Sequence, residues 1–174
     1  MEKVILNKTY GYKDFIENEG KDSILNWVQN NEHLFQKNVN GENRKFYRIK
    51  NDCEIYNFVW DLKKQIIELE KIKDWKEEPI YSDFIGINYK GGYIQSHTDK
   101  NEEDYTHLRW NLILSYPLEG GHSIYDGVTN ILEENMIWRC VAGKHTHASS
   151  PVFGDKPRIT LSLGFLVNNS YLFI

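Results

Sequence analysis

The chain has 174 residues, of which 40% are apolar and 14% aromatic, so it is long enough for one domain with a substantial core and too apolar for a disordered segment. The net charge of −4 gives no general electrostatic attraction to nucleic acid or to anionic membranes. Two isolated cysteines, Cys53 and Cys140, favour buried free thiols in a reducing compartment over a disulfide framework.

Two helices are expected in the N-terminal part of the chain. The first follows a candidate N-cap at Asp22 or Ser23, where apolar residues begin to recur at helical spacing. The second and stronger one is expected at 52–73, where apolar residues recur every three or four positions. Short strands are also expected at 3–6 and 46–49.

After Pro79 the sequence changes to short segments that are rich in β-branched and aromatic residues and separated by Gly or Pro. The strands expected here are 83–89, 93–99, 109–116, 122–126, 128–132, 136–142, 145–148 and 158–167. Short strands at close spacing favour a sandwich or a barrel. We therefore expect one mainly β domain over residues 1–174, in which a helical support region at 1–80 packs outside a β core at 81–174.

The sequence contains no targeting or membrane segment that we can recognise. The N-terminal apolar run is too short for a signal peptide, and no stretch approaches the roughly 18 apolar residues of a membrane span. We expect a cytoplasmic protein with no membrane contact.

His97 and Asp99 are the first candidates for a functional site. In a strand, residues two apart point to the same face, so this imidazole and this carboxylate would project together. One His and one carboxylate are two members of the facial triad that holds non-haem Fe(II) and leaves positions open. A second histidine must complete it, and His145 and His147 share one face of an expected strand.

Two motifs then resemble a known family. Tyr89-x-x-Gly ahead of His97-x-Asp99, and His147-x-x-x-Pro-Val followed by a Gly and then Arg158, are similar to the prolyl-4-hydroxylase-like branch of the Fe(II)/2-oxoglutarate-dependent oxygenases. The resemblance covers roughly the C-terminal half. It implies a double-stranded β-helix, the jelly-roll or cupin-like barrel, and it implies His97, Asp99 and His147 as the iron ligands, with His145 as the alternative to His147.

A basic residue is also expected for the cosubstrate. The C5 carboxylate of 2-oxoglutarate needs a fixed cation, and the fork of Arg158 suits it. Thr160 shares the face of Arg158 and adds a hydroxyl. Prolyl hydroxylases usually have Lys at this place, so Arg158 is a departure that keeps the charge.

A third motif, Leu108-Arg109-x-Asn111 followed by Pro117 and Gly120, resembles the aspartyl/asparaginyl β-hydroxylases, whose metal site lacks the carboxylate present here. It implies that Arg109 and Asn111 approach the C1 carboxylate of the cosubstrate. The alternative is a surface ion pair from Arg109 to a nearby acid, Glu102 or Glu103. The Tyr89 phenol is a further candidate donor to 2-oxoglutarate, or else a core residue.

The resemblance implies a dioxygenase that uses Fe(II), 2-oxoglutarate and O₂, with ascorbate as a candidate reductant. It would hydroxylate an unactivated C–H of a free amino acid, small metabolite or protein side chain, and release succinate and CO₂. The metal motif also superficially resembles that of the AlkB group of DNA and RNA repair enzymes. Such an activity is disfavoured, because the second downstream Arg that this resemblance would imply does not follow Arg158. The competing hypothesis is a cupin-like metal or small-molecule binding protein that is non-catalytic or independent of 2-oxoglutarate. Basic residues that could receive an anionic substrate, or else lie on a solvated surface, are Arg44, Lys45, Arg48 and Lys100.

Overall fold

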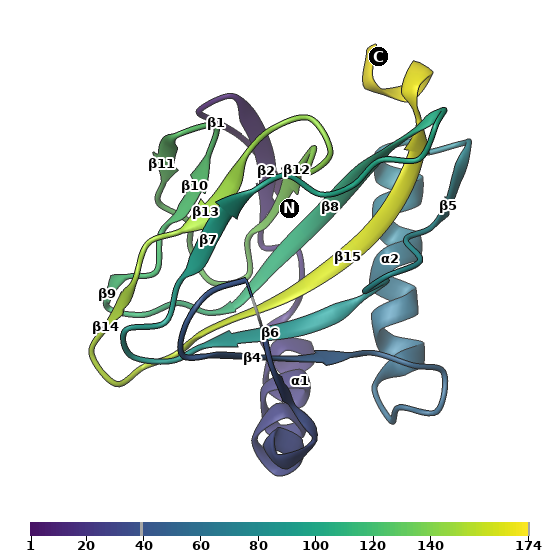
Figure 1. Cartoon of the computed structure of the whole chain (residues 1–174). Helices are drawn as coiled ribbons and strands as arrows, with labels where there is room; N and C mark the ends of the chain where they lie inside the picture. Colours follow the sequence, from purple (N-terminus) through teal and green to yellow (C-terminus); the bar gives the residue numbers. More distant parts are fainter. Residues whose placement is uncertain (39, 174) are drawn as a thin grey trace.

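The computed structural model describes residues 1–38 and 40–173, and it consists mainly of antiparallel strands with two α-helices on the outside (Figure 1). The helices are α1 (Asn18–Asn31), α2 (Tyr56–Leu69) and two short 3₁₀ helices, η1 (Glu32–Leu34) and η2 (Asn169–Phe173). The strands are β1 (Glu2–Leu6), β2 (Thr9–Lys13), β3 (Gln36–Lys37), β4 (Arg44–Arg48), β5 (Trp75–Glu77), β6 (Phe84–Asn88), β7 (Ile94–His97), β8 (Tyr105–Ser115), β9 (Glu119–Gly120), β10 (Ser123–Tyr125), β11 (Val128–Asn130), β12 (Ile137–Cys140), β13 (His147–Ser149), β14 (Val152–Phe153) and β15 (Arg158–Asn168).

The strands form a large sheet and a small one. The large sheet has the order β1-β2-β12-β8-β15-β6-β4-β3, with β5 also paired to β15. The small sheet has the order β11-β10-β13-β7, and β14 pairs with β9. Figure 1 shows the small sheet beside the strands β8, β15 and β6 of the large one. A cavity between the two sheets is lined by residues of both.

The large sheet separates a hydrophobic core from this cavity. On β6, Ile85 and Ile87 are buried in the same core cluster as Val59 and Ile66 of α2, because alternate residues of a strand face opposite sides. Phe84, Gly86 and Asn88 therefore face the other way, and all three line the cavity. The same alternation on β15 places Leu161 and Leu163 in the core and leaves its polar residues for the cavity.

The N-terminal part differs from the prediction at the start of its first helix. Helix α1 begins at Asn18, with Glu17 as the cap residue, so the expected N-caps Asp22 and Ser23 lie inside the helix and that prediction is wrong. Region 1–80 also supplies five strands of the large sheet, β1 to β5, of which β1 and β4 overlap the expected strands 3–6 and 46–49. Among the described residues, no helix has both the length and the apolar content needed to cross a bilayer.

Candidate metal centre and cosubstrate cavity

Three side chains of the types that bind metals converge where β13 pairs with β7, the edge strand of the small sheet. Strands β7 and β13 pair so that His97 lies directly opposite His147, and the two ring centroids are 4.2 Å apart. Asp99 follows two residues after His97, and its Oδ1 is 3.5 Å from Nε2 of His97 and 3.8 Å from Nε2 of His147. One candidate ligand atom from each of the three residues lies within 4.8 Å of the others.

Nε2 is the nitrogen of each imidazole that faces Oδ1 of Asp99. Nδ1 of His97 donates to the carbonyl oxygen of Gln95 at 2.7 Å, and a carbonyl only accepts, so this nitrogen carries a hydrogen. Burial lowers the pKa of His147 to about 4 and keeps that ring neutral at pH 7. The hydrogen bond with Asp99 raises the pKa of His97.

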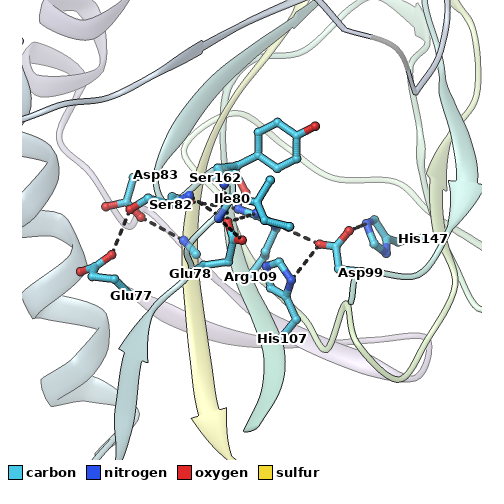
Figure 2. A network of polar contacts seen from close by, with 12 residues as sticks. Glu77, Glu78, Ile80, Ser82, Asp83, Asp99, His107, Arg109, His147 and Ser162 are labelled. Carbon is cyan, nitrogen blue, oxygen red and sulfur yellow. Dashed lines mark hydrogen bonds and ion pairs between the residues drawn. The ribbon is translucent and has the colours of Figure 1, made fainter. Parts of the chain in front are cut away.

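Asp99 is anchored through its second oxygen. Oδ2 accepts a hydrogen bond from Nε of Arg109 at 3.2 Å and lies 3.5 Å from Nδ1 of His107 (Figure 2). Burial alone would raise the Asp99 pKa, but the hydrogen bond from His97 and the charge of Arg109 outweigh it and leave this pKa well below its ordinary value. The result is an ionised carboxylate with one oxygen directed at two imidazoles. That donor set, two nitrogens and one oxygen, suits a non-haem Fe(II) ion.

Arg109 is itself held by a buried acid. Its Nη2 lies 2.9 Å from Oε2 of Glu78, and the two side chains are 6% and 1% exposed. Nη1 donates to the Ser82 carbonyl oxygen and to Oγ of Ser162 at 3.2 and 3.3 Å. Glu78 also accepts the backbone N–H groups of the turn that follows it, as Figure 2 shows.

This network corrects one sequence-based alternative. The acid that pairs with Arg109 is the buried Glu78 and not the surface Glu102 or Glu103. Arg109 still lines the cavity beside the ligand set, as does Asn111 two residues on. Because the Arg109 guanidinium already bonds to four protein groups, its first role in this geometry is to orient Asp99.

Arg158 lies at the far end of the cavity. It begins β15, is 5% exposed, and donates from Nη2 to Oγ of Ser123 at 2.9 Å. Its Nε and the Oγ1 of Thr160 are buried without a hydrogen-bond partner among the described residues. Burial lowers the Arg158 pKa to about 10, which leaves the group charged at neutral pH. A buried guanidinium with no carboxylate partner among the described residues, beside a buried hydroxyl with no hydrogen bond there, marks a place for an anionic ligand.

The cavity therefore has two connected parts. One part contains the three ligand-type residues with Arg109 and Asn111, and the other contains Arg158 and Thr160. Residues lining both parts are Arg44, Phe84, Ile94, Asn111, His147 and Ser162. Seven of the eight predicted site residues thus come together in one space.

Tyr89 is the exception, and His145 is not part of the ligand set. The Tyr89 hydroxyl donates to Oε1 of Glu32 at 2.7 Å, and this side chain lines neither part of the cavity. Its neighbour Asn88 faces the cavity instead. Nδ1 of His145 lies 3.1 Å from Oδ2 of Asp126, away from the ligand set.

Sequence reasoning missed two buried groups beside the ligands. His107 precedes the expected strand 109–116, but it lies in β8 with 3% exposure, and burial lowers its pKa to about 4. Glu78 is not among the predicted site residues. No local pattern distinguishes a buried acid of this kind from a solvated one, because its partner Arg109 is distant in the sequence.

No family model and no curated protein matches this chain. Solved structures do match. A viral collagen prolyl hydroxylase from Paramecium Bursaria Chlorella virus-1, in a 2-oxoglutarate complex, has 14% identity and a TM-score of 0.67 over 92% of this chain and 97% of its own. A prolyl hydroxylase from Trichoplax adhaerens, in complex with a hypoxia inducible factor peptide, has 12% identity and a TM-score of 0.71 over 92% and 84%. HygX from Streptomyces hygroscopicus, with nickel, 2-oxoglutarate and hygromycin B bound, has 7% identity and a TM-score of 0.72 over 91% and 82%.

These similarities define the fold. The chain has the double-stranded β-helix fold of the Fe(II)/2-oxoglutarate oxygenases, which confirms the predicted fold class and the resemblance to the prolyl hydroxylases at the level of architecture. Within that fold it carries a His–Asp–His ligand set of the facial-triad type.

Proposed function

We propose that this protein is an Fe(II)- and 2-oxoglutarate-dependent dioxygenase that hydroxylates an unactivated C–H bond and releases succinate and CO₂. One observation carries the proposal. Three metal-ligand side chains open into the same cavity as a buried arginine that has no carboxylate partner among the described residues. A metal-binding protein that used no dicarboxylate would have no need of such a cation, and Arg158 therefore weighs against the cupin-like alternative.

The residues that would hold the metal are His97, Asp99 and His147, through Nε2, Oδ1 and Nε2. When bound, Fe(II) and 2-oxoglutarate together activate O₂ and supply the oxidising power for the hydroxylation. The protein contributes the fixed geometry of the ligands. Arg109 restrains Oδ2 of Asp99, so that Oδ1 stays directed toward the two imidazoles.

Arg158 and Thr160 would hold the C5 carboxylate of 2-oxoglutarate. Ser123 accepts from Nη2 of Arg158 and so fixes the plane of the guanidinium. The remaining N–H groups of Arg158 and the Thr160 hydroxyl are then free to donate to a carboxylate. Asn111, which lines both parts of the cavity, lies between this end and the metal ligands and is the candidate contact for the C1 carboxylate.

Small molecules and peptides are both represented among the structural relatives. The prolyl hydroxylase from Trichoplax adhaerens was solved with a peptide fragment, and HygX with hygromycin B. We propose a small-molecule or peptide substrate at the metal end of the cavity, where Tyr81, Phe84 and Ile94 supply apolar surface.

Anaerobic binding and turnover test the proposal in sequence. The purified protein should bind one equivalent of Fe(II) or Mn(II), and then 2-oxoglutarate, by isothermal titration calorimetry. With Fe(II), ascorbate and O₂ it should form succinate from 2-oxoglutarate, even uncoupled from any substrate. A protein that binds metal but neither binds nor consumes 2-oxoglutarate would instead be the cupin-like binding protein.

A further inference from the structure

Arg44 is a second buried arginine in the cavity, and it has no carboxylate partner among the residues that the structure describes. It begins β4, is 7% exposed and lines both parts of the cavity. Nη1 reaches the Asn40 carbonyl oxygen at 3.4 Å, and Nε has no hydrogen-bond partner among the described residues. The charged neighbour that affects Arg44 most is Arg158, which repels it. Burial and this repulsion lower the Arg44 pKa to about 10, so the group stays charged at neutral pH.

The sheet register fixes how the two arginines are arranged. Arg44 on β4 lies opposite Asn88 on β6, and Asn88 lies opposite Arg158 on β15. Residues directly opposite in adjacent strands share a face, so both guanidinium groups project into the same cavity, with one strand between them. A Cβ added at Gly86 would lie 3.9 Å from Nη2 of Arg44, an ordinary van der Waals contact, so the guanidinium lies above β6 at this position.

With Fe(II) and 2-oxoglutarate bound, the charged groups of the cavity would still lack one anion. The two charges of Fe(II) and the single charge of Arg158 are matched by Asp99 and the two carboxylates of 2-oxoglutarate. Glu78 matches Arg109. Arg44 is then left as a buried cation without a counter-ion in the described part of the chain, which is costly in a low-dielectric site. A substrate with one negative charge would neutralise it.

We propose that Arg44 binds a carboxylate of the substrate and that the substrate is a small organic acid with an apolar body. This inference rests on the proposed function, and it names the substrate class for that site. The lining of the cavity fits such a molecule, because the rings of Tyr81 and Phe84 and the side chain of Ile94 supply apolar surface, and Asp99 is the one acid among the described lining residues. A cationic group would find no carboxylate there other than the metal ligand. A carboxylate can reach a side chain this deeply buried only by entering the cavity, which favours a compact molecule over the surface of a folded protein.

The test uses isovalerate as the probe acid and isovaleramide as its uncharged counterpart. Both are titrated calorimetrically into anaerobic wild-type protein loaded with Mn(II) and saturated with 2-oxoglutarate. We expect isovalerate to bind at least about tenfold more tightly than the amide, because only the acid forms a charge-assisted bond. In Arg44→Met, isovalerate affinity should fall by about tenfold or more, while the dissociation constant for 2-oxoglutarate changes by less than about threefold.

A second readout separates a ligand-binding arginine from a structural one. If Arg44 is paired only when a ligand is bound, Arg44→Met should raise the urea midpoint of the metal-free protein, because it removes an unpaired buried charge. Arg109→Met is the matched control and should lower the midpoint, because it leaves Glu78 and Asp99 without their partner.

Several results would overturn the inference. They are equal binding of isovalerate and isovaleramide, no binding of isovalerate, isovalerate binding that persists in Arg44→Met, and a loss of 2-oxoglutarate affinity in Arg44→Met as large as that in Arg158→Met. The last result would assign Arg44 to the cosubstrate. Failure of the wild-type protein to bind Mn(II) and 2-oxoglutarate would refute the proposed function itself, whereas normal binding of both with any of the results above refutes only the substrate class.

Discussion

Replacement of Glu78 by Gln isolates the buried charge that supports the metal ligands. Glu78 is 1% exposed, lies 2.9 Å from Arg109, and accepts the backbone N–H groups of residues 80, 81 and 82 at 2.8 Å each. The amide of Gln keeps the size and one acceptor oxygen but removes the negative charge. Arg109 is then left with Asp99 as its one carboxylate partner among the described residues.

The expected cost follows from this burial. Removal of one partner of a buried ion pair costs about 3–5 kcal/mol. Because Asp99 remains 3.2 Å from Arg109, we expect the lower end, about 3 kcal/mol. The free energy of unfolding of a typical domain is about 5–15 kcal/mol, so Glu78→Gln should still fold. We also expect about tenfold weaker Mn(II) binding, because Arg109 now competes with the metal for the charge of Asp99.

Urea unfolding of the metal-free protein and calorimetric Mn(II) titration measure the two effects. The control is Glu102→Gln, the same chemical change at an acid that is 46% exposed and 3.6 Å from Lys76, which should cost less than about 1 kcal/mol. A Glu78→Gln variant as stable as this control would refute the reasoning. So would additive losses in Glu78→Gln combined with Arg109→Met, because coupled partners must deviate from additivity.

Three further predictions concern the ligands, the cosubstrate and pH. His147→Ala should abolish Mn(II) binding in calorimetry and His145→Ala should not; the reverse order would reassign the ligand. Arg158→Met should weaken 2-oxoglutarate binding about 100-fold in the same assay, and an unchanged affinity would remove Arg158 from the cosubstrate site. Burial would raise the Glu134 pKa, but bonds from Lys156 and from backbone and side-chain neighbours outweigh it and lower this pKa from 4.5 to about 2. Since the folded-state pKa is the lower one, Glu134 stabilises the protein fully above pH 4.5 and loses that contribution as the pH falls toward 2. Glu134→Gln should therefore reduce the pH dependence of the urea midpoint in this window, and an identical pH profile would contradict the assignment.

The part of the site that lies within one short segment could be predicted from the sequence. His97 and Asp99 are two residues apart, and the period of a strand is enough to place them together. His147 required more, because only the antiparallel register of β7 and β13 brings it opposite His97. Spacing alone left His145 and His147 equivalent, and the family resemblance separated them. The geometry gives the physical difference, since His145 pairs with Asp126 outside the ligand set.

The position of Tyr89 agrees with the core alternative, and the strand that precedes it gives the reason. Ile85 and Ile87 are β-branched residues with one face in common, and that face packs into the helical core. Strand alternation then assigns Gly86 and Asn88 to the cavity side and Tyr89 to the other. The period-two pattern already present in the sequence therefore indicates Asn88, and not Tyr89 of the Tyr-x-x-Gly motif, as the residue that faces the cavity.

The buried acid Glu78 could not be predicted in the same way. Its partner Arg109 lies 31 residues away, and neither residue belongs to a pattern that marks it as buried. Local periodicity reports which side of an element is apolar, whereas a buried ion pair depends on two elements that meet only in the folded chain. The start of α1 at Asn18 has a similar origin, because no side-chain cap marks it and burial of Ile24 and Val28 stabilises the helix.

The three arginines around the cavity allow one physical comparison. Arg109 has two carboxylate partners, whereas Arg44 and Arg158 have none among the described residues, although all three are at most 7% exposed. Pairing within the protein stabilises the fold, and a cation left unpaired destabilises it until a ligand binds. Substitution by Met should therefore lower the urea midpoint at Arg109 and raise it at Arg44 and Arg158 in the metal-free protein. Saturating Mn(II) and 2-oxoglutarate should then stabilise wild type and Arg44→Met by similar amounts and Arg158→Met by much less, because only Arg158 binds the cosubstrate. Destabilisation of the metal-free protein by all three substitutions would mean that Arg44 and Arg158 are structural, and that the site is not preorganised for two anions.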